Sequence, residues 1–452
     1  MTAERFTDAP RRSAQRSQRN VGSAISAVSA LYVLASIATA QAQTPLQLGA
    51  LQHEAQAADA RSREIDQLAR QSDLRLQTID VDQKPAISVL GQTQYQSDST
   101  TAPFPLPGGQ PAFIAPKFTY DAGVRVDQRV YDPSIGPRRA VERAGLAESQ
   151  ARVRTSLFGL RQEVNDAFFT IALMQQQIGA LTASIADLEA RLRETQAHVR
   201  EGTALAGEAA AVEAALLRQR QQADELRATR AAARARLERL TGRTIADDTP
   251  LALPDLGDAA TRARQSLDAV RARPEYAQFA KTRERVAAQQ DAAGAIDRPQ
   301  ISVFGRAGYG QPGLNAINEH GQGYALGGLQ MQWKAWSWNA SDHERAALAL
   351  QQDIVSSEEA AFTSALHRAV ENDLATIDRL QRTAADDDHI IELREAIDRA
   401  ARLRFNEGVT TAADYLDRRT EWLTAQFDRA RHRVELAYAQ ARLLTTLGLE
   451  VQ

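Results

Sequence analysis

The chain has 452 residues, of which 43% are hydrophobic, 25% are charged and only 6% are aromatic, and it contains no cysteine. This length can bury a large core or fill two or three ordinary domains. The absence of cysteine excludes disulfides, thiolate metal sites, thiol catalysis and lipid attachment through an N-terminal cysteine. The formal net charge of −3 comes without a basic stripe, which argues against a nucleic acid as the partner.

The first 42 residues have the pattern of a bacterial secretory signal peptide. A basic stretch precedes a run over 21–40 that is apolar and rich in small residues, and both 38–40 and 40–42 fit an A-x-A cleavage site. A signal anchor that stays in the membrane is the alternative, but the run is rich in Ser and Ala and ends in a cleavage pattern. Residues 1–40 hold five Arg and two acidic residues, so cleavage after Ala40 or Ala42 changes the net charge from −3 to −6. The arginines of the basic stretch are Arg11, Arg12, Arg16 and Arg19.

The next predicted elements are a short helix and two strands. The helix covers about 62–83, and Pro85 ends it and opens a strand. Apolar and polar residues alternate along both strands, and strands of about ten residues with this pattern fit a barrel with lipid outside and water inside. A sheet with one solvated face would show the same alternation, so the strands alone leave both interpretations open. The apolar positions include Ile87, Val89, Tyr95, Phe118, Tyr120, Val124, Val126 and Val130.

The longest predicted element is a helix from about Arg138 to Val199, which spans roughly 90 Å at about 1.5 Å per residue. Its apolar and small residues recur at alternating steps of three and four, which is the period of a coiled-coil seam. A glycine turn at Gly202 leads into a return helix over 203–241. Because one helix cannot bury such a seam alone, we expect long partner helices. The seam residues are Leu157, Leu160, Val164, Ala167, Ile171, Met174, Ile178, Leu181, Ile185, Leu188, Leu192, Thr195 and Val199.

The second half of the chain repeats the first half. An offset of 206 residues separates both Gly202 from Gly408 and Gly242 from Gly448, and similar segments accompany each pair. A short helix over about 275–297, two more strands, a long helix over 343–404 and a return helix are therefore expected. We assign a first repeat to 43–243, a linker that packs at the waist of the rods to 244–260, and a second repeat to 261–452.

Four strands per chain cannot close a barrel, and lipid does not tolerate an open sheet edge. At least two chains are needed, and the residues alone do not decide between two and three. Nothing after the signal segment is apolar enough to span a membrane as a helix. Trp333, Trp336 and Trp338 fit either an aromatic belt at a membrane surface or ordinary packing.

Three short motifs stand out in the chain. Residues 273–275 fit an RP[ED] motif, residues 299–305 resemble a P-x-[IL]-x-[LF]-x-G strand entry, and residues 404–417 resemble a Y-x-x-G-x-x-[ST]-x-x-D-x-L-[DE] turn. These motifs resemble those of the outer membrane efflux protein family, the TolC-type channels. The resemblance covers about 45–449, in the correct order and in both repeats.

The resemblance implies a fold that is mainly α with a membrane β-barrel portion. In this family three identical chains form a trimeric α-barrel of long coiled-coil helices, and a 12-stranded β-barrel with four strands per chain continues it. Such a homotrimer is a passive channel in the outer membrane with a long periplasmic extension. Its partners are a periplasmic adaptor protein and an inner-membrane transporter of the RND or ABC type, in an efflux pump or a type I secretion system.

The resemblance also places the turns at Gly202 and Gly408 at the periplasmic tip, where helices close the pore and the adaptor docks. Asp414 and Asp417 lie one helical turn apart, and three chains would arrange them as acidic rings that favour cations. The alternative is that both carboxylates are solvated tip residues.

The tip departs from the family pattern in two positions. The family's lock uses a Tyr three residues before the second glycine and a basic residue two after it, whereas this chain has Phe405 and Thr410. Glu208 keeps the position of an acidic partner on the neighbouring turn. Without the hydroxyl and the base, we expect apolar coiling to hold the tip shut.

No catalytic pattern is present in the sequence, and we expect no enzyme activity and no cofactor. A Gly-rich phosphate loop and a G-x-S-x-G motif are both absent. We interpret the acidic run 386–389 as a solvated helix face rather than a metal site. Two other function classes compete: a periplasmic adaptor, which would show one hairpin between Gly-rich β modules, and a structural coiled coil, which needs no alternating strands.

Overall fold

A computed structural model describes residues 45–98, 107–108, 115–247, 249–315 and 320–451. The predicted signal segment lies outside these residues. The described residues belong to one compact unit of the chain, in which two repeats have the same order of elements.

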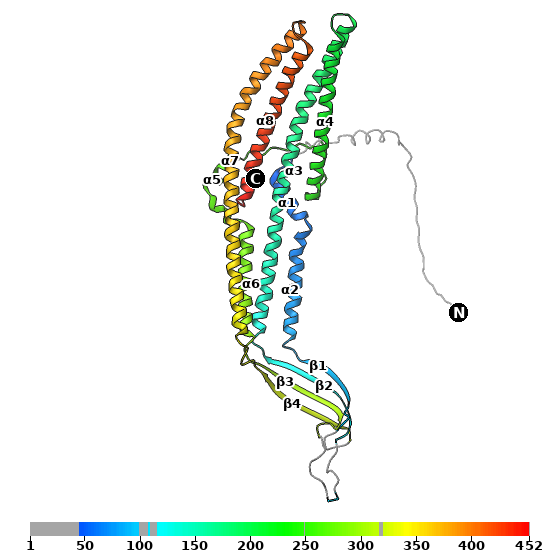
Figure 1. Ribbon diagram of the computed structural model, residues 1–452, viewed down its shortest axis with the longest axis vertical. Helices are drawn as coiled ribbons and strands as arrows, with labels where there is room; N and C mark the ends of the chain where they lie inside the picture. The colour runs from blue at the N-terminus through cyan, green and yellow to red at the C-terminus, as the bar shows by residue number, and fades with distance from the viewer. Residues whose placement is uncertain (1–44, 99–106, 109–114, 248, 316–319, 452) are drawn as a thin grey trace, which may run out of the picture. The chain divides into compact units, whose positions relative to one another are not determined.

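Each repeat consists of helices, two strands, one very long helix and a return helix (Figure 1). The first contains α1 (Leu48–Ala58), the 3-10 helix η1 (Ala60–Arg63), α2 (Glu64–Val81), β1 (Ala86–Tyr95), β2 (Phe118–Tyr131), α3 (Ile135–Arg200) and α4 (Ala206–Thr241). The second contains α5 (Gly257–Gln265), the 3-10 helix η2 (Leu267–Ala272), α6 (Pro274–Ala295), β3 (Gln300–Gln311), β4 (Gln322–Gln332), α7 (Ala340–Asn406) and α8 (Ala412–Thr446).

The two long helices are the scaffold of the repeats. α3 has 66 residues and α7 has 67, so each spans about 100 Å. α4 packs along one end of α3 and α2 along the other, while α8 and α6 do the same for α7 (Figure 1). None of the seam residues predicted in α3 is exposed, which confirms the coiled-coil period.

Glycines end the corresponding helices of the two repeats in the same backbone conformation. Gly202 and Gly408, in the turns that follow α3 and α7, have φ angles of 74° and 70°. Gly242 and Gly448, after α4 and α8, have φ angles of 69° and 79°. This left-handed region is costly for any residue with a Cβ, so the repeated glycines are needed where the chain reverses or leaves a helix.

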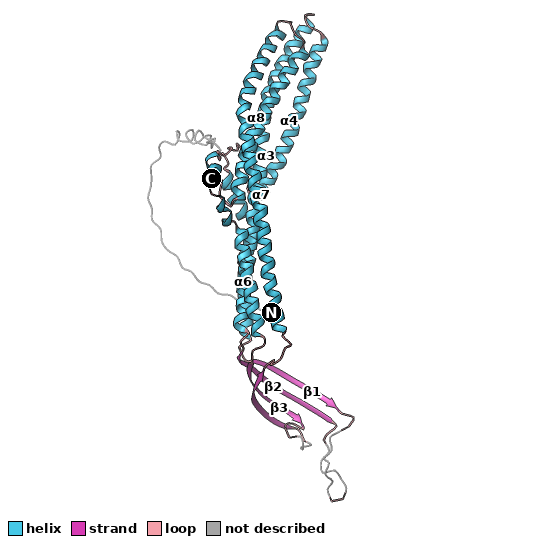
Figure 2. Cartoon of the chain, turned by 60° about the vertical axis from the view of Figure 1, so that its left-hand side comes forward, coloured by secondary structure: helices cyan, strands magenta, loops and turns pink. Residues whose placement is uncertain are grey.

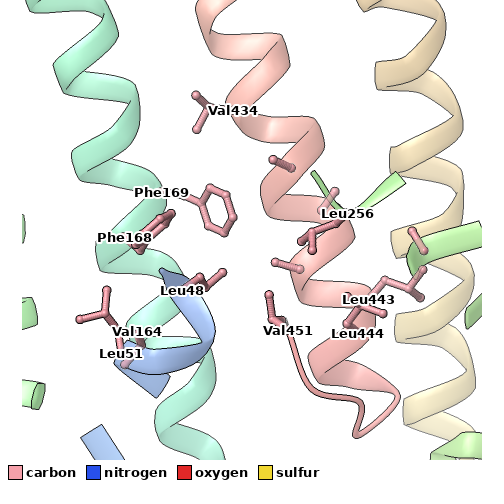
Figure 3. Packing of buried hydrophobic residues seen from close by; sticks show 14 of the residues in the cluster. Leu48, Leu51, Val164, Phe168, Phe169, Leu256, Val434, Leu443, Leu444 and Val451 are labelled. Carbon is pink, nitrogen blue, oxygen red and sulfur yellow. The ribbon is translucent and has the colours of Figure 1, made fainter. Parts of the chain in front are cut away.

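The largest apolar cluster lies where the two repeats meet (Figure 3). It joins α1, the middle of α3, the segment between the repeats, α7 and the end of α8. The main core thus lies where α4 and α8 end beside the long helices, and where α2 and α6 take over as their partners. Its members include Leu48, Leu51, Val164, Phe168, Phe169, Leu256, Val434, Leu443, Leu444 and Val451.

Arg273 connects the start of α6 to the end of α8. Its Nη1 donates to the carbonyl oxygen of Thr446 at 3.0 Å, and its guanidinium pairs with Glu275. The same group lies 5.0 Å from the ring centre of Phe158 and 5.5 Å from that of Phe362. One side chain therefore caps α8, pairs with the first turn of α6 and contacts both long helices.

The four strands form one antiparallel sheet in the order β1-β2-β3-β4 (Figure 2). β1 pairs with β2 from Ala86 opposite Asp127 to Tyr95 opposite Phe118, and β3 pairs with β4 from Gln300 opposite Gln332 to Gly310 opposite Gln322. The central β2–β3 pair joins the two repeats through main-chain hydrogen bonds.

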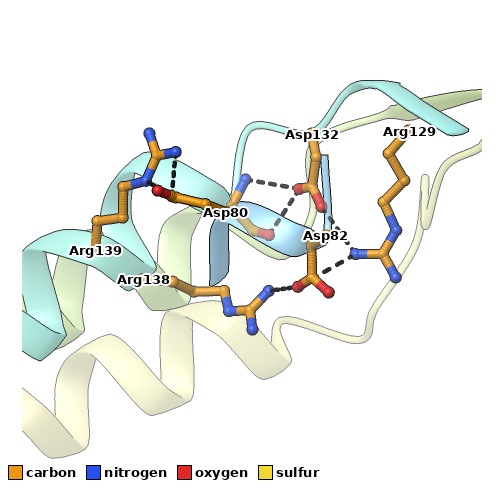
Figure 4. A network of polar contacts seen from close by, with 7 residues as sticks. Asp80, Asp82, Arg129, Asp132, Arg138 and Arg139 are labelled. Atoms are coloured by element: carbon orange, nitrogen blue, oxygen red, sulfur yellow. Dashed lines mark hydrogen bonds and ion pairs between the residues drawn. The ribbon is translucent and has the colours of Figure 1, made fainter. Parts of the chain in front are cut away.

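An ion-pair network joins the sheet to the helices in the first repeat (Figure 4). Asp82, just after α2, pairs with Arg138 of α3 at 2.6 Å and with Arg129 of β2 at 3.8 Å. Asp80 pairs with Arg139, which adds a second link between α2 and α3. The end of α2, the end of β2 and the start of α3 are thereby held together.

We expect Gly448→Ala and Gly179→Ala to have opposite effects on stability. A Cβ at position 448 would require φ near 79° and would lie 3.1 Å from Cγ of Arg273, so the free energy of unfolding should fall by about 1–2 kcal/mol. Gly179 is exposed inside α3 with no atom within 4 Å of a built Cβ, so alanine should add about 0.5–1 kcal/mol. Thermal unfolding in detergent, followed by far-ultraviolet circular dichroism, measures both. If both variants changed the unfolding temperature by the same amount and in the same direction, the special role of Gly448 at the end of α8 would be contradicted.

Candidate functional site

The two faces of the sheet differ in chemistry. Apolar side chains are exposed along one face of all four strands, and Val89 reaches 82% exposure. The register places Val89 beside Val124, and Val303 beside Leu329, so these residues form one continuous apolar surface. Water does not favour such a surface, and its size indicates a contact with lipid or with another protein.

The opposite face of the sheet is polar and internally paired. Arg125 Nε donates to Asp127 at 2.8 Å, and Asp121 pairs with Arg306 and accepts a hydrogen bond from the hydroxyl of Tyr324 at 2.5 Å. Glycines line this face beside them; a Cβ at Gly308 would lie 2.7 Å from a carbonyl oxygen of β2. The polar face therefore carries closely spaced charges with little room for further side chains, which suits a water-filled interior.

The sheet has two edges without a strand partner among the described residues. β1 pairs only with β2, and β4 pairs only with β3. Each outer edge presents main-chain donors and acceptors that lipid cannot satisfy. A chain that placed this apolar face in a membrane would have to pair its β1 edge and its β4 edge with other copies.

At the opposite end of the long helices, Thr411 and Asp414 form the first turn of α8. The main-chain N–H of Asp414 donates to Oγ1 of Thr411 at 3.2 Å, and the hydroxyls of Thr411 and Thr410 donate to Oδ2 of Asp414 at 3.0 and 3.1 Å. These hydrogen bonds lower the pKa of Asp414, first through Thr411 and then through Thr410. Thr411 is thus the N-cap of α8, and it holds the exposed carboxylate of Asp414 in place. Asp417 is exposed one turn later.

The other residues predicted at the tip lie in different turns and do not all form one cluster with Asp414. Gly202 and Gly408 occupy equivalent turns, as expected from the repeat. Glu208 lies in the first turn of α4, and among the described residues no ion pair is found for it. Thr410 bonds to Asp414 of its own turn, and Phe405 packs into the protein.

Arg191 of α3 joins the two helical hairpins close to the tip, and the sequence interpretation missed it. Its guanidinium lies 5.6 Å from the ring centre of Phe405 in α7 and 5.3 Å from that of Tyr415 in α8. These two rings stack at 5.4 Å with 8° between their planes, and Arg191 also donates to Asn406. A buried cation therefore holds a stacked aromatic pair where the family pattern would have a tyrosine hydroxyl and a base.

A second polar group of residues lies next to Arg191. Asp187 of α3 accepts a hydrogen bond from the hydroxyl of Tyr415 at 3.3 Å, and it pairs with Arg419 at 3.4 Å. Arg419 also pairs with Asp398 of α7 at 3.3 Å. Burial raises the pKa of Asp398, and Arg419 opposes that rise. Three helices of one chain thus share a single buried set of charges.

The acidic run 386–389 is not wholly a solvated face, which corrects the sequence interpretation. Asp387 is buried and bonds to the ring nitrogen Nδ1 of His432 in α8 at 2.8 Å. Asp388 pairs with Arg429 at 2.5 Å and with Arg433 at 3.2 Å, so the run ties α7 to α8. Across the described residues, no group of three or more His, Cys, Asp or Glu side chains is placed to hold a metal ion.

Sequence comparisons give no relatives, whereas structural comparisons give many. No protein-family model matches the chain, and no curated protein matches its sequence. The open-state outer membrane channel MtrE of Neisseria gonorrhoeae is 19% identical, with a TM-score of 0.64 over 89% of each chain. CusC is 13% identical, with a TM-score of 0.67 over 90% of this chain and 93% of that chain. The Campylobacter jejuni channel CmeC is 13% identical, with a TM-score of 0.65 over 89% of this chain and 86% of that chain.

This chain has the fold of the outer membrane efflux channels. The match extends over both repeats and includes four strands from one chain, as the TolC-type resemblance implies. Among the described residues, no helix combines the length and apolar character that a membrane span needs.

We expect Arg191→Ala to loosen the contact between the two hairpins. The variant loses a cation–π contact and a hydrogen bond to Asn406, each worth about 1 kcal/mol, so amide hydrogen exchange in the first turns of α8 should accelerate about tenfold or more. Arg193→Ala is the matched control, because Arg193 lies two residues away on α3 and is exposed. Hydrogen exchange followed by mass spectrometry measures both variants. Unchanged exchange in Arg191→Ala would show that this side chain does not hold the hairpins.

Proposed function

We propose that this chain is one subunit of a passive channel in the outer membrane, with a long helical extension through the periplasm. The observation that carries the proposal is the four-stranded sheet at one end of the long helices. One of its faces exposes apolar side chains, and the other carries paired charges. This arrangement supports a lipid contact on one face and an aqueous path along the other. The fold shared with outer membrane efflux channels supports the same assignment.

The helices support a closed ring of identical chains. In the half next to the sheet, α3 and α6 lie between α2 and α7, so α2 and α7 form the two margins of the layer. Both margins expose apolar residues, Leu74 and Val81 on α2 and Leu350 and Ile354 on α7. Two different margins that meet head to tail generate a ring, and contact between copies would bury these residues.

Three copies fit the function better than two. Two copies would give eight strands, and side chains fill the interior of an eight-stranded barrel. Three copies would give twelve strands and leave room for an aqueous channel beside Arg125, Asp127 and Arg306. We therefore propose a homotrimer.

Partners are proposed at the periplasmic tip. Leu205 and Val409 are strongly exposed beside the glycine turns, and such apolar side chains suit a contact with a helical hairpin of a periplasmic adaptor. An inner-membrane transporter of the RND or ABC type would then supply the energy, in an efflux pump or a type I secretion system. Export from this transporter to the outside is the activity that follows.

The two competing function classes account for less of the structure. A periplasmic adaptor or a structural coiled coil explains the long helices, but neither uses a four-stranded sheet with an exposed apolar face and charges inside. The sheet therefore favours the channel.

The proposed function is tested by assembly and conductance together. We expect mature protein in the outer membrane fraction, as heat-resistant trimers that conduct ions in planar lipid bilayers. Leu393→Arg should reduce the trimer yield at least tenfold, because Leu393 belongs to an exposed apolar stripe of α7, with Ile390 and Ile397, that the ring would bury. Leu393→Met is the matched control and should assemble normally.

Two results would contradict these expectations. Soluble periplasmic material that forms no trimers and conducts no current would contradict the channel and favour one of the other two classes. Normal trimers from Leu393→Arg would show that this stripe lies outside the contact between copies.

Asp414 and Asp417 are proposed to form acidic rings at the tip of the trimer. The hydrogen bonds from Thr411 and Thr410 lower the pKa of Asp414, which favours the ionised form of its carboxylate. Asp414→Asn combined with Asp417→Asn should lower the preference for cations, measured as a shift of the reversal potential toward zero in a salt gradient across a planar bilayer. Asp386→Asn, on the same pair of helices, is the control. An unchanged reversal potential in the double variant would remove the ring assignment.

A further inference from the structure

A hollow of about 850 Å³ opens where the sheet meets the helices, and we call it the junction hollow. α3 and α7 begin beside it and α6 ends beside it, and each helix lines it with residues at steps of three and four, so one face of each contributes. Pockets that hold small organic molecules have volumes of roughly 300–1,000 Å³, so the hollow is large enough for one. Among its lining residues are Val141, Glu142, Ala292, Ile296, Glu344 and Leu348.

The junction hollow lies on the polar side of the sheet. Gln300 lines the hollow and begins β3, and the alternation along this strand places it on the same face as Arg306. An ion-pair chain makes the same connection: Arg129 on the polar face of β2 pairs with Asp82, which pairs with Arg138 in the lining of the hollow (Figure 4). A ligand in the hollow would therefore be on the side of the paired charges, away from the apolar face.

Apolar side chains line much of the junction hollow. Ile296, at the end of α6, is 56% exposed, although Val141 of α3 and Leu348 of α7 line the same space. The chain thus leaves a large aliphatic side chain in contact with water inside a concave surface. A ligand with an apolar body would displace that water, which is favourable.

Charged side chains also line the junction hollow, and two of them are paired within the chain. Arg138 pairs with Asp82 at 2.6 Å. Glu142 pairs with Arg75 at 3.7 Å. The charges of these two lining residues are therefore compensated by neighbours on or just after α2.

The other lining charges leave an excess of one carboxylate. Asp297, Glu344 and Lys334 line the hollow, and within the part of the chain that the structure describes none of them forms an ion pair. Glu344 and Lys334 are exposed, and Asp297 is half-buried. Two carboxylates against one ammonium group give the hollow an excess of negative charge next to its apolar lining. A concave site of this kind attracts cations and, among them, favours those with an apolar body.

We propose that the junction hollow binds organic cations with an apolar body, such as quaternary ammonium or phosphonium compounds. Asp297 and Glu344 face the positive charge of the ligand, and Ile296 contacts its apolar body. In the proposed channel the polar face of the sheet borders the aqueous path, so the hollow opens onto that path; this location rests on the proposed function. The inference thus assigns a substrate class to the channel.

Equilibrium dialysis of tetraphenylphosphonium against the purified mature protein tests the binding. A nonionic detergent at equal concentration on both sides cancels the uptake of the probe by micelles. We expect saturable binding with one site per chain. Tetraphenylborate has the same shape and the opposite charge, and it should bind at least tenfold more weakly.

Charge substitutions in the hollow should change the affinity for tetraphenylphosphonium in opposite directions. Asp297→Asn and Glu344→Gln should each weaken binding at least threefold, because each removes a carboxylate from the lining. Lys334→Gln should strengthen binding at least threefold, because it removes a like charge. Asp342→Asn is the matched control, since Asp342 is exposed two residues before Glu344 and does not line the hollow; its affinity should stay within twofold of the wild type.

A single introduced thiol locates the bound ligand, because the chain has no cysteine of its own. In Ile296→Cys, tetraphenylphosphonium should slow the reaction with a maleimide at least fivefold. Ser341→Cys, which also replaces a lining residue, is the second reporter if the first variant does not fold. Ala287→Cys is the matched control, since Ala287 is exposed on α6 outside the lining, and its reaction rate should not change.

The outcomes separate this inference from the proposed function. The absence of saturable binding, an unchanged affinity in both carboxylate variants, or a lining thiol that the ligand does not protect would each refute the site. None of these measurements needs a current across a bilayer. Conducting trimers without such binding would therefore refute only this inference, whereas binding and protection in a protein that forms no conducting trimers would uphold the site and refute the channel.

Discussion

The constraint that organises this chain is the length of its seam. A helix of 66 residues buries one apolar stripe, and α4 with 36 residues covers only part of it. A second partner must therefore continue where the return helix stops, and the chain must build a joint between the two partners. The largest apolar cluster lies at that joint, together with Gly242, Gly448 and the guanidinium of Arg273. The RP[ED]-like motif is thus explained physically as a cap for α8 and an entry to α6.

The sheet imposes the second constraint, which concerns assembly. One face of the sheet exposes apolar residues and the other face carries ion pairs, so folding of one subunit leaves an apolar surface uncovered. The edges of β1 and β4 leave main-chain hydrogen-bonding groups unpaired among the described residues, and the margins on α2 and α7 expose further apolar side chains. The proposed ring of copies in lipid would satisfy all of these features at once, and folding and assembly would then be parts of one process.

Much of the fold could be predicted because its signals are local. Alternation in β2 and the steps of three and four in α3 are visible in consecutive residues, and the glycines mark the turns by a conformation that few other residues adopt. α1 and α5 were not predicted, because helices of 11 and 9 residues have short patterns and depend on packing in the waist.

The candidate site was harder to predict than the fold. The interpretation of Asp387 as solvated was wrong because its partner, His432, lies 45 residues away on α8, and an amphipathic pattern does not say which neighbour a polar residue meets. Arg191 left a weak signal, since it is three residues after Leu188 and four before Thr195 and so shares the face of the seam. An arginine on such a face indicates a buried polar contact, but only the fold identifies the stacked rings of Phe405 and Tyr415 as its partners.

The contacts near Gly408 link the residues that hold the two helical hairpins together to the carboxylate of Asp414. Arg191 holds Asn406, two residues before the glycine, and the hydroxyls of Thr410 and Thr411 hold Asp414, six residues after it. Tyr415, which Arg191 also contacts, follows Asp414 directly in the first turn of α8. A movement that separates the two hairpins must displace this turn, and the carboxylate of Asp414 moves with it. The residues that hold the hairpins together therefore also set the position of the acidic side chains, so in the proposed channel opening and ion preference would depend on one turn.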